Sequence, residues 1–219
     1  MATNSMTDYL KQLIQDEQAA LVYIMDPMCS WCWAFKPVLA EIRKTFPELG
    51  YYTLAGGLAP DSDEPMPEGQ QEQIAAIWKK IEATVGTRFN HDFWTQCQPR
   101  RSTYPACRAL LLARKEGKAD AMIAVIQEAY YLKAKNPSDI DTLADCAESV
   151  GMDRSAFEKA IVGPDVNEEF EQELAFNHHL GARSFPTLVL KTADKWFEIA
   201  LDYKDASVMI DQIHQRLKA

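Results

Sequence analysis

The sequence predicts an α/β protein in which two mixed α/β segments flank a block that is almost wholly helical. Three observations support this prediction. An apolar run at 20–26 precedes a cysteine pair and a helical pattern, and nearly every segment between 64 and 163 has helical periodicity. Near the C-terminus, two short apolar runs form the pattern of a β-hairpin. The predicted order is β-α-β, a helical block, then α-β-β-α.

The N-terminal segment supplies the first helices and strands. A strand over 20–26 is followed by a helix that ends near Phe46 and contains Pro37, which we expect to kink it. A second strand over 51–58 should run parallel to the first through a right-handed crossover. Ahead of these, a short helix is predicted within 7–17 by three apolar residues at helical spacing: Leu10, Leu13 and Ile14.

The central block begins after a proline-rich, acidic stretch at 59–69 that has the composition of a linker. Gly86 and Gly117 are expected to end two helices, the second of which starts at Thr103. Ser138 is expected to cap a later helix. The apolar residues expected to face the core of this block are Ile74, Ile77, Trp78, Ile81, Val85, Met122, Ile126, Ala129, Tyr130, Ile140, Leu143, Ala147, Val150, Phe157 and Ile161.

The C-terminal segment begins with a helix that starts near Asp165 and ends at Gly181. Apolar runs at 187–190 and 196–201 then predict the hairpin, and a final helix follows over 204–217. The apolar residues carried by that last helix are Val208, Ile210 and Ile213.

Without its helical block the chain has a thioredoxin-like layout, with helices on both faces of a small mixed sheet. The sequence therefore predicts a discontinuous thioredoxin-like domain over 1–63 and 164–219. An all-helical insertion over 64–163 separates its two parts. A chain of 219 residues is long enough for one domain with such an insertion.

Two cysteines spaced by two residues, Cys29 and Cys32, stand where the first strand gives way to the helix. A sulfur at a helix N-terminus lies against unpaired backbone N–H groups and the positive end of the helix dipole, which favour the thiolate. Cys29 is therefore predicted to be the attacking sulfur, with a pKa below the ~8.5 of free cysteine. Cys32, one turn further on, is suited to be the resolving partner. Asp26 either tunes the thiol pKa and relays a proton, or is simply an acid at a strand end.

A structural zinc site and a pair of inert core cysteines are the alternative interpretations of this motif. Structural zinc needs four ligands, and one Cys-x-x-Cys supplies two. No second such motif follows, and the adjacent His178 and His179 would face different directions on a helix, so no metal is expected. Five cysteines at irregular spacing do not form a disulfide framework. The remaining three are expected to be small buried hydrophobes: Cys97, Cys107 and Cys146.

The charge balance excludes some classes of partner. The net charge is −9 with a pI near 5.0 and no basic block, which argues against nucleic acid and against an anionic membrane surface. No apolar run approaches the ~20 residues that span a bilayer. Residues 1–17 lack a basic segment followed by an apolar one, so no secretory signal is predicted and a cytoplasmic location is expected. In such a reducing compartment, a Cys-x-x-Cys motif is more often catalytic or metal-binding than part of a structural disulfide.

Three groups of residues resemble the DsbA family of thioredoxin-fold proteins. The likeness is greatest to the branch of FrnE-like proteins and assigned protein-disulfide isomerases that lack a signal peptide. The first group is Asp-Pro-Met-Cys-Ser-Trp-Cys at 26–32, with Pro37 five residues later. The second, Gly-Ala-Arg-Ser-Phe-Pro-Thr at 181–187, is similar to the family's cis-proline loop. The third is the helical insertion, with Tyr-Pro-Ala-Cys-Arg-Ala at 104–109 resembling the start of one of its helices. The dipeptide between the cysteines, Ser30-Trp31, lacks the histidine or proline found in several strong oxidants and reductants. The direction of the redox reaction therefore stays open.

The resemblance implies roles for residues around the cysteines. Pro186 would follow a cis peptide bond, pack against both cysteines as part of the catalytic site, and leave the backbone of Phe185 free to pair with an extended substrate. Without the resemblance, a trans-proline at the start of an edge strand is the simpler interpretation. The candidate substrate-binding residues are Ser30, Trp31 and Phe185, with the ring of Trp31 partly exposed. Two other aromatic residues near the pair are assigned to the core: Trp33 and Phe35.

Together these features predict a thiol–disulfide oxidoreductase, similar to a protein-disulfide isomerase, that works through a mixed disulfide on Cys29. The expected partners are a disulfide-containing protein or small molecule and a cellular thiol reductant. No cofactor is expected beyond the redox-active pair itself, with glutathione as a potential co-substrate. One alternative is a glutathione-dependent isomerase or transferase of the kappa-class or hydroxychromene-carboxylate-isomerase type. Another is a non-catalytic partner-binding module that uses the helical insertion.

Overall fold

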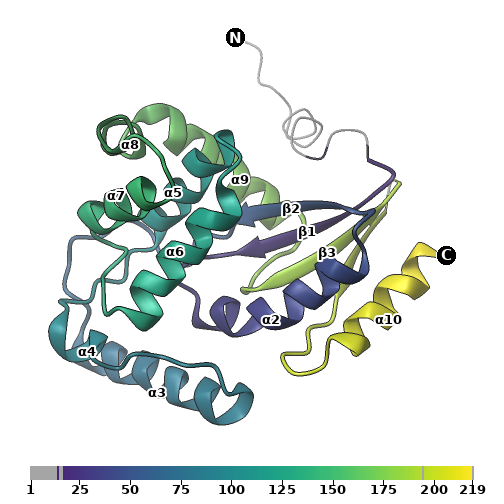
Figure 1. Cartoon of the computed structure of the whole chain (residues 1–219), viewed down its shortest axis with the longest axis horizontal. Coiled ribbons are helices and arrows are strands. Elements are labelled where there is room, and N and C mark those ends of the chain that lie inside the picture. The colour runs from purple at the N-terminus through teal and green to yellow at the C-terminus, as the bar shows by residue number, and fades with distance from the viewer. Residues whose placement is uncertain (1–13, 15–16, 194, 219) are drawn as a thin grey trace.

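Four strands form a mixed sheet in the order β2-β1-β3-β4 (Figure 1). β1 (Ala19–Met25) pairs in parallel with β2 (Gly50–Ala55), and helix α2 (Ser30–Thr45) lies between them in the chain, as predicted for a crossover. β3 (Thr187–Thr192) runs antiparallel to β1 and also to β4 (Lys195–Ile199), which confirms the hairpin.

The computed structural model describes residue 14, residues 17–193 and residues 195–218. The helix predicted within 7–17 lies almost wholly outside these residues. Among the helices of the described part, none has the length and apolar character that crossing a lipid bilayer requires.

Both faces of the sheet are covered by helices. Alternate residues of a strand point to opposite faces, and β1 follows this rule. One set faces the helices α2 and α10 (Ala206–Leu217), which lie along one side of the sheet in Figure 1: Leu21, Tyr23 and Met25. The other set packs with Phe176 of α9 (Pro164–His179): Ala20, Val22 and Ile24. β1 is therefore apolar over its whole length, as expected of a strand buried on both faces.

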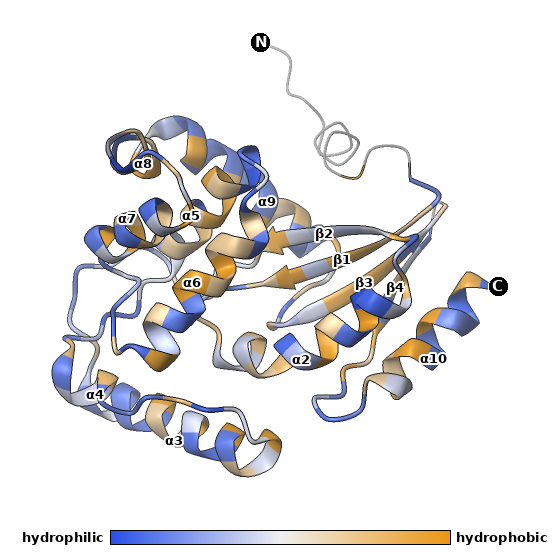
Figure 2. Ribbon diagram, in the orientation of Figure 1, coloured by the Kyte–Doolittle hydropathy of each residue, from blue (hydrophilic) through white to orange (hydrophobic). Residues whose placement is uncertain are grey.

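The chain between β2 and α9 forms the helical block. Its helices are α3 (Glu68–Val85), α4 (Phe93–Gln96), α5 (Tyr104–Lys115), α6 (Ala119–Leu132), α7 (Ile140–Ser149) and α8 (Arg154–Ile161). They enclose a second core around Trp78, which is fully buried among other aromatic rings. Figure 2 shows polar and apolar residues interleaved along α3 and α10, in contrast to the apolar β1.

Helix α5 contributes to both cores. Leu110 and Leu111 pack with the sheet, whereas Ala109 and Ala113 belong to the helical core. The division into a thioredoxin-like domain over 1–63 and 164–219 and an insertion over 64–163 stays a prediction.

The second strand is shorter than predicted and ends at Ala55, three residues before Leu58. The backbone N–H of Gly56 still donates to the carbonyl of Met25 at 2.6 Å, but Gly57 then turns the chain with a φ of +71°. Glycine adopts this left-handed conformation at little cost. A Cβ at Gly57 would also meet the side chain of Leu174 at 2.5 Å. The turn directs the backbone of Leu58 towards Asp26, at the end of β1.

Two helix-start predictions are corrected. Ser138 does not cap α7; Asp139 precedes the helix, and the hydroxyl of Ser138 donates to the carbonyl of Ser102 at 2.7 Å. The last helix begins at Ala206, where the carboxylate of Asp205 accepts from the N–H of Ser207.

One predicted core position is wrong, that of Ile77, and two other apolar residues, Val208 and Trp33, are less than fully buried. Val208 is 46% exposed, because the buried stripe of α10 runs through Ala206, Met209 and Ile213 instead. Ile77 of α3 is exposed as well. Trp33 is only partly buried, since its indole N–H donates to the carbonyl of Arg88 near the surface, whereas Phe35 is fully buried as predicted.

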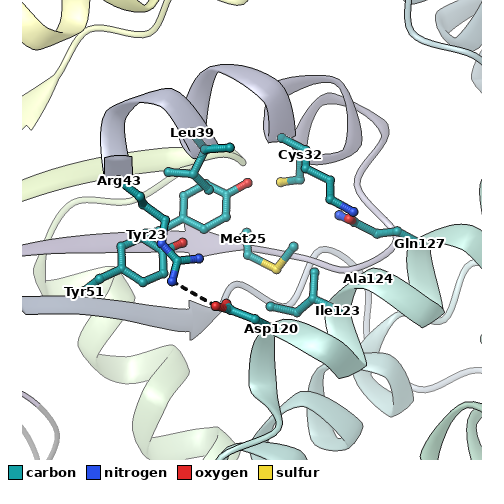
Figure 3. Close-up of a pocket in the computed structure, with 12 residues that line it drawn as sticks. Tyr23, Met25, Cys32, Leu39, Arg43, Tyr51, Asp120, Ile123, Ala124 and Gln127 are labelled. Carbon is teal, nitrogen blue, oxygen red and sulfur yellow. Dashed lines mark ion pairs between the residues drawn. The ribbon is translucent and has the colours of Figure 1, made fainter. Parts of the chain in front are cut away.

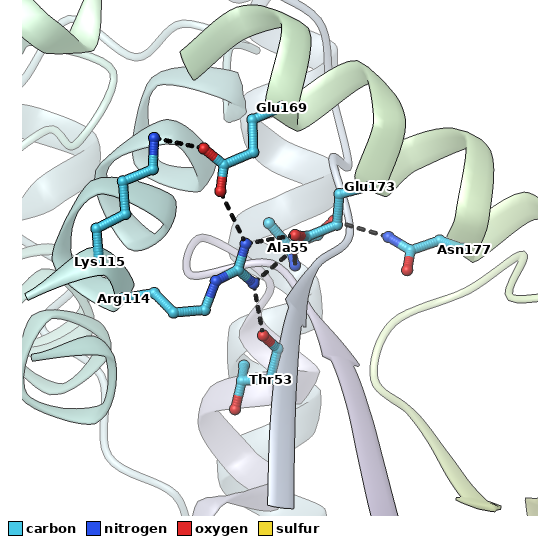
Figure 4. Close-up of polar contacts among 7 residues, drawn as sticks. All are labelled: Thr53, Ala55, Arg114, Lys115, Glu169, Glu173 and Asn177. Carbon is cyan, nitrogen blue, oxygen red and sulfur yellow. Dashed lines mark hydrogen bonds and ion pairs between the residues drawn. The ribbon is translucent and has the colours of Figure 1, made fainter. Parts of the chain in front are cut away.

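A buried carboxylate attaches α9 to the sheet and to α5 (Figure 4). Glu173 is completely buried, and its carboxylate accepts from the backbone N–H of Ala55 and from the guanidinium of Arg114 at 2.6 Å. Arg114 also donates to the carbonyl of Thr53 at 3.1 Å, and the amide of Asn177 donates to the carbonyl of Ala55 at 2.8 Å. A buried charge is tolerated when it is paired and hydrogen-bonded in this way.

Candidate active site

The turn between β1 and α2 places Cys29 at the helix N-terminus. The backbone N–H of Cys29 donates to the carbonyl of Asp26 at 3.0 Å, and Cys29 then occupies the position just before Ser30, the first helical residue. Cys32 lies within the first turn of α2. Both are free thiols; Cys29 is 6% exposed and Cys32 is 1% exposed. The predicted strand, turn and helix around the pair are confirmed.

The two thiols differ in acidity because hydrogen-bond donors converge on one of them. The Cys32 thiol, and the backbone N–H groups of Cys32 and Trp31, stabilise the thiolate of Cys29. These bonds outweigh the cost of burial and hold the pKa of Cys29 below its ordinary value. Burial, reinforced by the neighbouring sulfur, raises the pKa of Cys32 well above its ordinary value. Cys29, the slightly less buried of the two, is therefore the one that is more readily present as the reactive thiolate.

The loop before β3 meets the cysteines from the other half of the chain. The thiol of Cys29 donates to the carbonyl of Phe185 at 3.3 Å, although the two residues are 156 positions apart. The peptide bond between Phe185 and Pro186 is cis. Pro186 is buried and Phe185 is partly exposed, so the loop presents an aromatic side chain and a backbone carbonyl beside the attacking sulfur.

A groove of about 500 Å³ opens over this loop. Its walls include Trp31, Val85, Phe185, Pro186, Leu201 and Tyr203. The ring of Trp31 is half-buried, and its centre lies 4.7 Å from that of Tyr203. Polar residues complete the lining: Thr84, Ser184, Asp202 and Lys204. The groove therefore offers aromatic and aliphatic surface with a polar rim, and it reaches Cys29 through Phe185, whose carbonyl contacts the sulfur. Ser30 is half-buried at the start of α2, and its predicted contact with substrate stays a prediction.

Asp26 is fully buried and gathers four donors. Oδ1 accepts from the N–H of Met28 at 2.8 Å, and Oδ2 accepts from the N–H of Leu58 at 2.7 Å and from the hydroxyl of Thr103 at 2.6 Å. The thiol of Cys107 is the fourth donor, at 3.4 Å. Burial raises the pKa of Asp26, although the donors oppose that shift, and its negative charge raises the pKa of both Cys29 and Cys32. Both interpretations of Asp26 thus have a structural basis.

We expect Asp26→Asn to lower the pKa of Cys29, because the substitution removes a negative charge that opposes the thiolate. The midpoint of a pH profile for alkylation of Cys29, followed by mass spectrometry, should move to lower pH. Stability should fall by about 1–3 kcal/mol, since an amide nitrogen in place of either oxygen leaves a backbone N–H of Met28 or Leu58 without an acceptor.

Asp92→Asn is the matched control, because Asp92 is exposed and lies in the helical block. It should leave the alkylation profile unchanged. An unchanged or alkaline-shifted midpoint in Asp26→Asn would show that Asp26 holds the turn together without influencing the thiol.

Sequence reasoning missed three members of this site. Thr103 was predicted only as a helix start and Cys107 only as a packing residue, yet both bind Asp26. Tyr203 follows β4 in a stretch without periodicity, and no local signal links it to Trp31. The structure brings no three His, Cys, Asp or Glu side chains of its described residues together as metal ligands.

Residues 20–212 match the family model of the DSBA-like thioredoxin domain. The chain belongs to this family. Membership supports a thiol–disulfide oxidoreductase in general terms, and it agrees with the resemblance carried by the cysteine pair and the loop before β3.

Two proteins of similar sequence are named as adapter proteins. The chain is 26% identical over 175 residues to the ClpXP adapter protein SpxH of Halalkalibacterium halodurans and 22% identical over 172 residues to that of Shouchella clausii. Each match covers 75% of this chain but only 56% and 55% of the respective relative, so the chain spans about half the length of the curated relatives it matches.

Solved structures share the fold over nearly the whole chain. A Nitrosomonas europaea protein assigned as a protein disulfide isomerase has a TM-score of 0.79 and 24% identity, covering 92% of this chain and 98% of that one. The cytosolic disulfide reductase DsbM of Pseudomonas aeruginosa has a TM-score of 0.73 and 23% identity, covering 91% and 98%, and has also been solved with GSH. At these identities the likeness establishes the fold, an α/β thioredoxin-type fold with helical additions.

Proposed function

We propose that the protein exchanges disulfides through a mixed-disulfide intermediate on Cys29. The observation that carries this proposal is the pairing of an acidified sulfur at a helix N-terminus with a protonated neighbour one turn away. The Cys29 thiolate attacks one sulfur of a substrate disulfide, a new bond forms to Cys29, and one substrate thiolate leaves. Cys32 then gives up its proton and attacks Cys29, which releases the second substrate thiol and leaves the pair oxidised. Substrate oxidation follows the same steps in reverse.

The groove over the Phe185–Pro186 loop supports a substrate that presents apolar groups beside its disulfide. Trp31, Phe185 and Tyr203 supply aromatic surface, and the carbonyl of Phe185 lies within hydrogen-bond distance of the reacting sulfur. An extended peptide or a small disulfide fits this description, because both expose a backbone or amide donor next to the S–S bond. A cellular thiol, with glutathione as the first candidate, would return the pair to its reduced state. The cytoplasmic location stays a prediction.

Equilibrium titration against mixtures of reduced and oxidised glutathione tests the proposal. We expect an intramolecular Cys29–Cys32 disulfide with a single midpoint, resolved by mass spectrometry after acid quenching. Accumulation of a stable glutathione adduct on Cys29, without closure to Cys32, would contradict a dithiol mechanism. That outcome would instead support a glutathione-dependent isomerase or transferase, for which a resolving thiol has no purpose.

A further inference from the structure

The hydroxyl of Tyr23 lies beside the sulfur of the resolving cysteine. Tyr23 belongs to β1 and faces α2, and Figure 3 shows its hydroxyl directed at the sulfur of Cys32. Both side chains line a cleft of about 170 Å³ between α2 and α6. A side-chain hydrogen bond links the two, and Tyr23 is its donor, because the bond favours the neutral phenol. The phenol is therefore in contact with an atom that reacts in the proposed exchange.

The position of this hydroxyl is fixed by the middle of the sheet. Tyr23 pairs with Thr53 of β2 on one side and with Leu188 of β3 on the other. The centre of its ring lies 6.0 Å from that of Phe35, and the residue is 4% exposed. A hydroxyl buried in this way is costly unless it forms a hydrogen bond, so a phenylalanine would suit a packing role better. The hydroxyl is thus a donor that needs no movement to reach the sulfur.

The sulfur of Cys32 needs such a donor when the disulfide closes. To attack the mixed disulfide, Cys32 must become a thiolate. Burial raises the pKa of Cys32, and so do the neighbouring Cys29 and the negative charge of Asp26. A hydrogen bond from the backbone of Asp26 opposes these effects. The phenol of Tyr23 adds another opposing bond, and a hydrogen bond to an ionised acceptor is roughly twice as strong as one between neutral groups.

We propose that Tyr23 is a catalytic residue whose hydroxyl stabilises the Cys32 thiolate while the disulfide closes. This inference rests on the proposed function and assigns a further group to its second step. The proton of Cys32 ends on the substrate thiolate released in the first step. The Cys32 thiolate, held by the Tyr23 hydroxyl, then forms its bond to Cys29 as the bond between Cys29 and the substrate breaks. In the reverse direction the same hydroxyl stabilises Cys32 as it leaves, and the phenol keeps its own proton throughout.

The rate of closure, measured apart from the rate of attack, tests this role. Reduced protein is mixed with oxidised glutathione and quenched in acid at successive times. Mass spectrometry then gives the amounts of the glutathione adduct of Cys29 and of the Cys29–Cys32 disulfide. Tyr23→Phe keeps the ring and removes only the hydroxyl. We expect closure to slow roughly tenfold, so that the adduct accumulates, while the attack of Cys29 keeps its rate.

Tyr51→Phe is the matched control. Tyr51 lines the same cleft from β2, and its side-chain hydrogen bond is with Thr53 instead of a sulfur. This variant should close the disulfide at the rate of the unchanged protein. Equal amounts of adduct in Tyr23→Phe and Tyr51→Phe would overturn the proposal. It would also be overturned if attack and closure slow by the same factor in Tyr23→Phe, since a loss of packing affects both steps.

A second variant keeps the hydroxyl and changes only its strength as a donor. A tyrosine fluorinated beside the hydroxyl, incorporated at position 23 by codon suppression, has a more acidic phenol and should close the disulfide faster than the unchanged protein. Closure at an equal or lower rate would overturn the inference, even if Tyr23→Phe does not fold. Failure of the proposed function is distinguishable, because the unchanged protein would then form no Cys29–Cys32 disulfide with oxidised glutathione.

Discussion

Cys29→Ser should abolish disulfide exchange, with a loss on the order of 10³-fold or more, as for removal of other enzymatic nucleophiles. A serine hydroxyl at this position cannot ionise near neutral pH, so the hydrogen bonds that stabilise the Cys29 thiolate have no anion to act on. Cys32→Ser should also stop turnover but for a different reason. Its Cys29 can still attack, so a mixed disulfide with the substrate should persist and be visible by mass spectrometry.

Cys97→Ser is the matched control for these variants. Cys97 is a partly exposed thiol of the helical block whose sulfur donates to the carbonyl of Ala134, a bond that serine can also make. It should keep full activity and trap nothing. Stable adducts in Cys29→Ser but not in Cys32→Ser would reverse the assigned roles, and full exchange in Cys29→Ser would refute a catalytic Cys29. If both cysteine variants instead retain a binding partner while no exchange occurs in any form, the non-catalytic partner-binding module that uses the helical insertion becomes the better hypothesis.

The core of the site could be predicted because its signals are local. The apolar run of β1, the spacing of Cys29 and Cys32 and the helical pattern of α2 are contiguous, and together they fix a sulfur at a helix N-terminus. The loop at Phe185 could be linked to it only through a family resemblance. Spacing alone does not show that a residue 156 positions away supplies a carbonyl to Cys29.

The contacts that the sequence did not predict involve side chains from segments far apart in the chain. Thr103 stands where a helix start is expected, and its sequence gives no sign that its hydroxyl binds the carboxylate of Asp26 rather than an N–H of its own helix. Trp33 is assigned to the core from the sequence and does pack against the helical core, but its indole N–H requires an acceptor and finds it near the surface, so the side chain is only partly buried. Glu173 shows the limit most clearly. It occupies a helical position beside the apolar stripe of α9, and charged residues are almost never fully buried unless paired.

Glu173→Ala is expected to produce the largest loss of stability, about 3–5 kcal/mol, the range found when one partner of a buried pair is removed. The backbone N–H of Ala55 would lose its acceptor, and Arg114 would lose the carboxylate that it contacts through two nitrogens. Urea unfolding should show a lower midpoint with an unchanged slope if the native state remains compact. Glu173→Gln should lose less stability, because its amide oxygen can still accept from the backbone N–H of Ala55.

Glu169→Ala is the matched control on the same helix. Its carboxylate pairs with Lys115 and Arg114 but is 22% exposed, and a partly exposed pair of this kind is worth about 0–1 kcal/mol. If the free energy of unfolding falls by the same small amount in both alanine variants, the carboxylate of Glu173 contributes no more to stability than a surface charge does. A larger loss confined to Glu173→Ala would identify it as the link between α9, α5 and β2. The chain runs from α9 into the loop that carries Phe185, whose carbonyl faces Cys29.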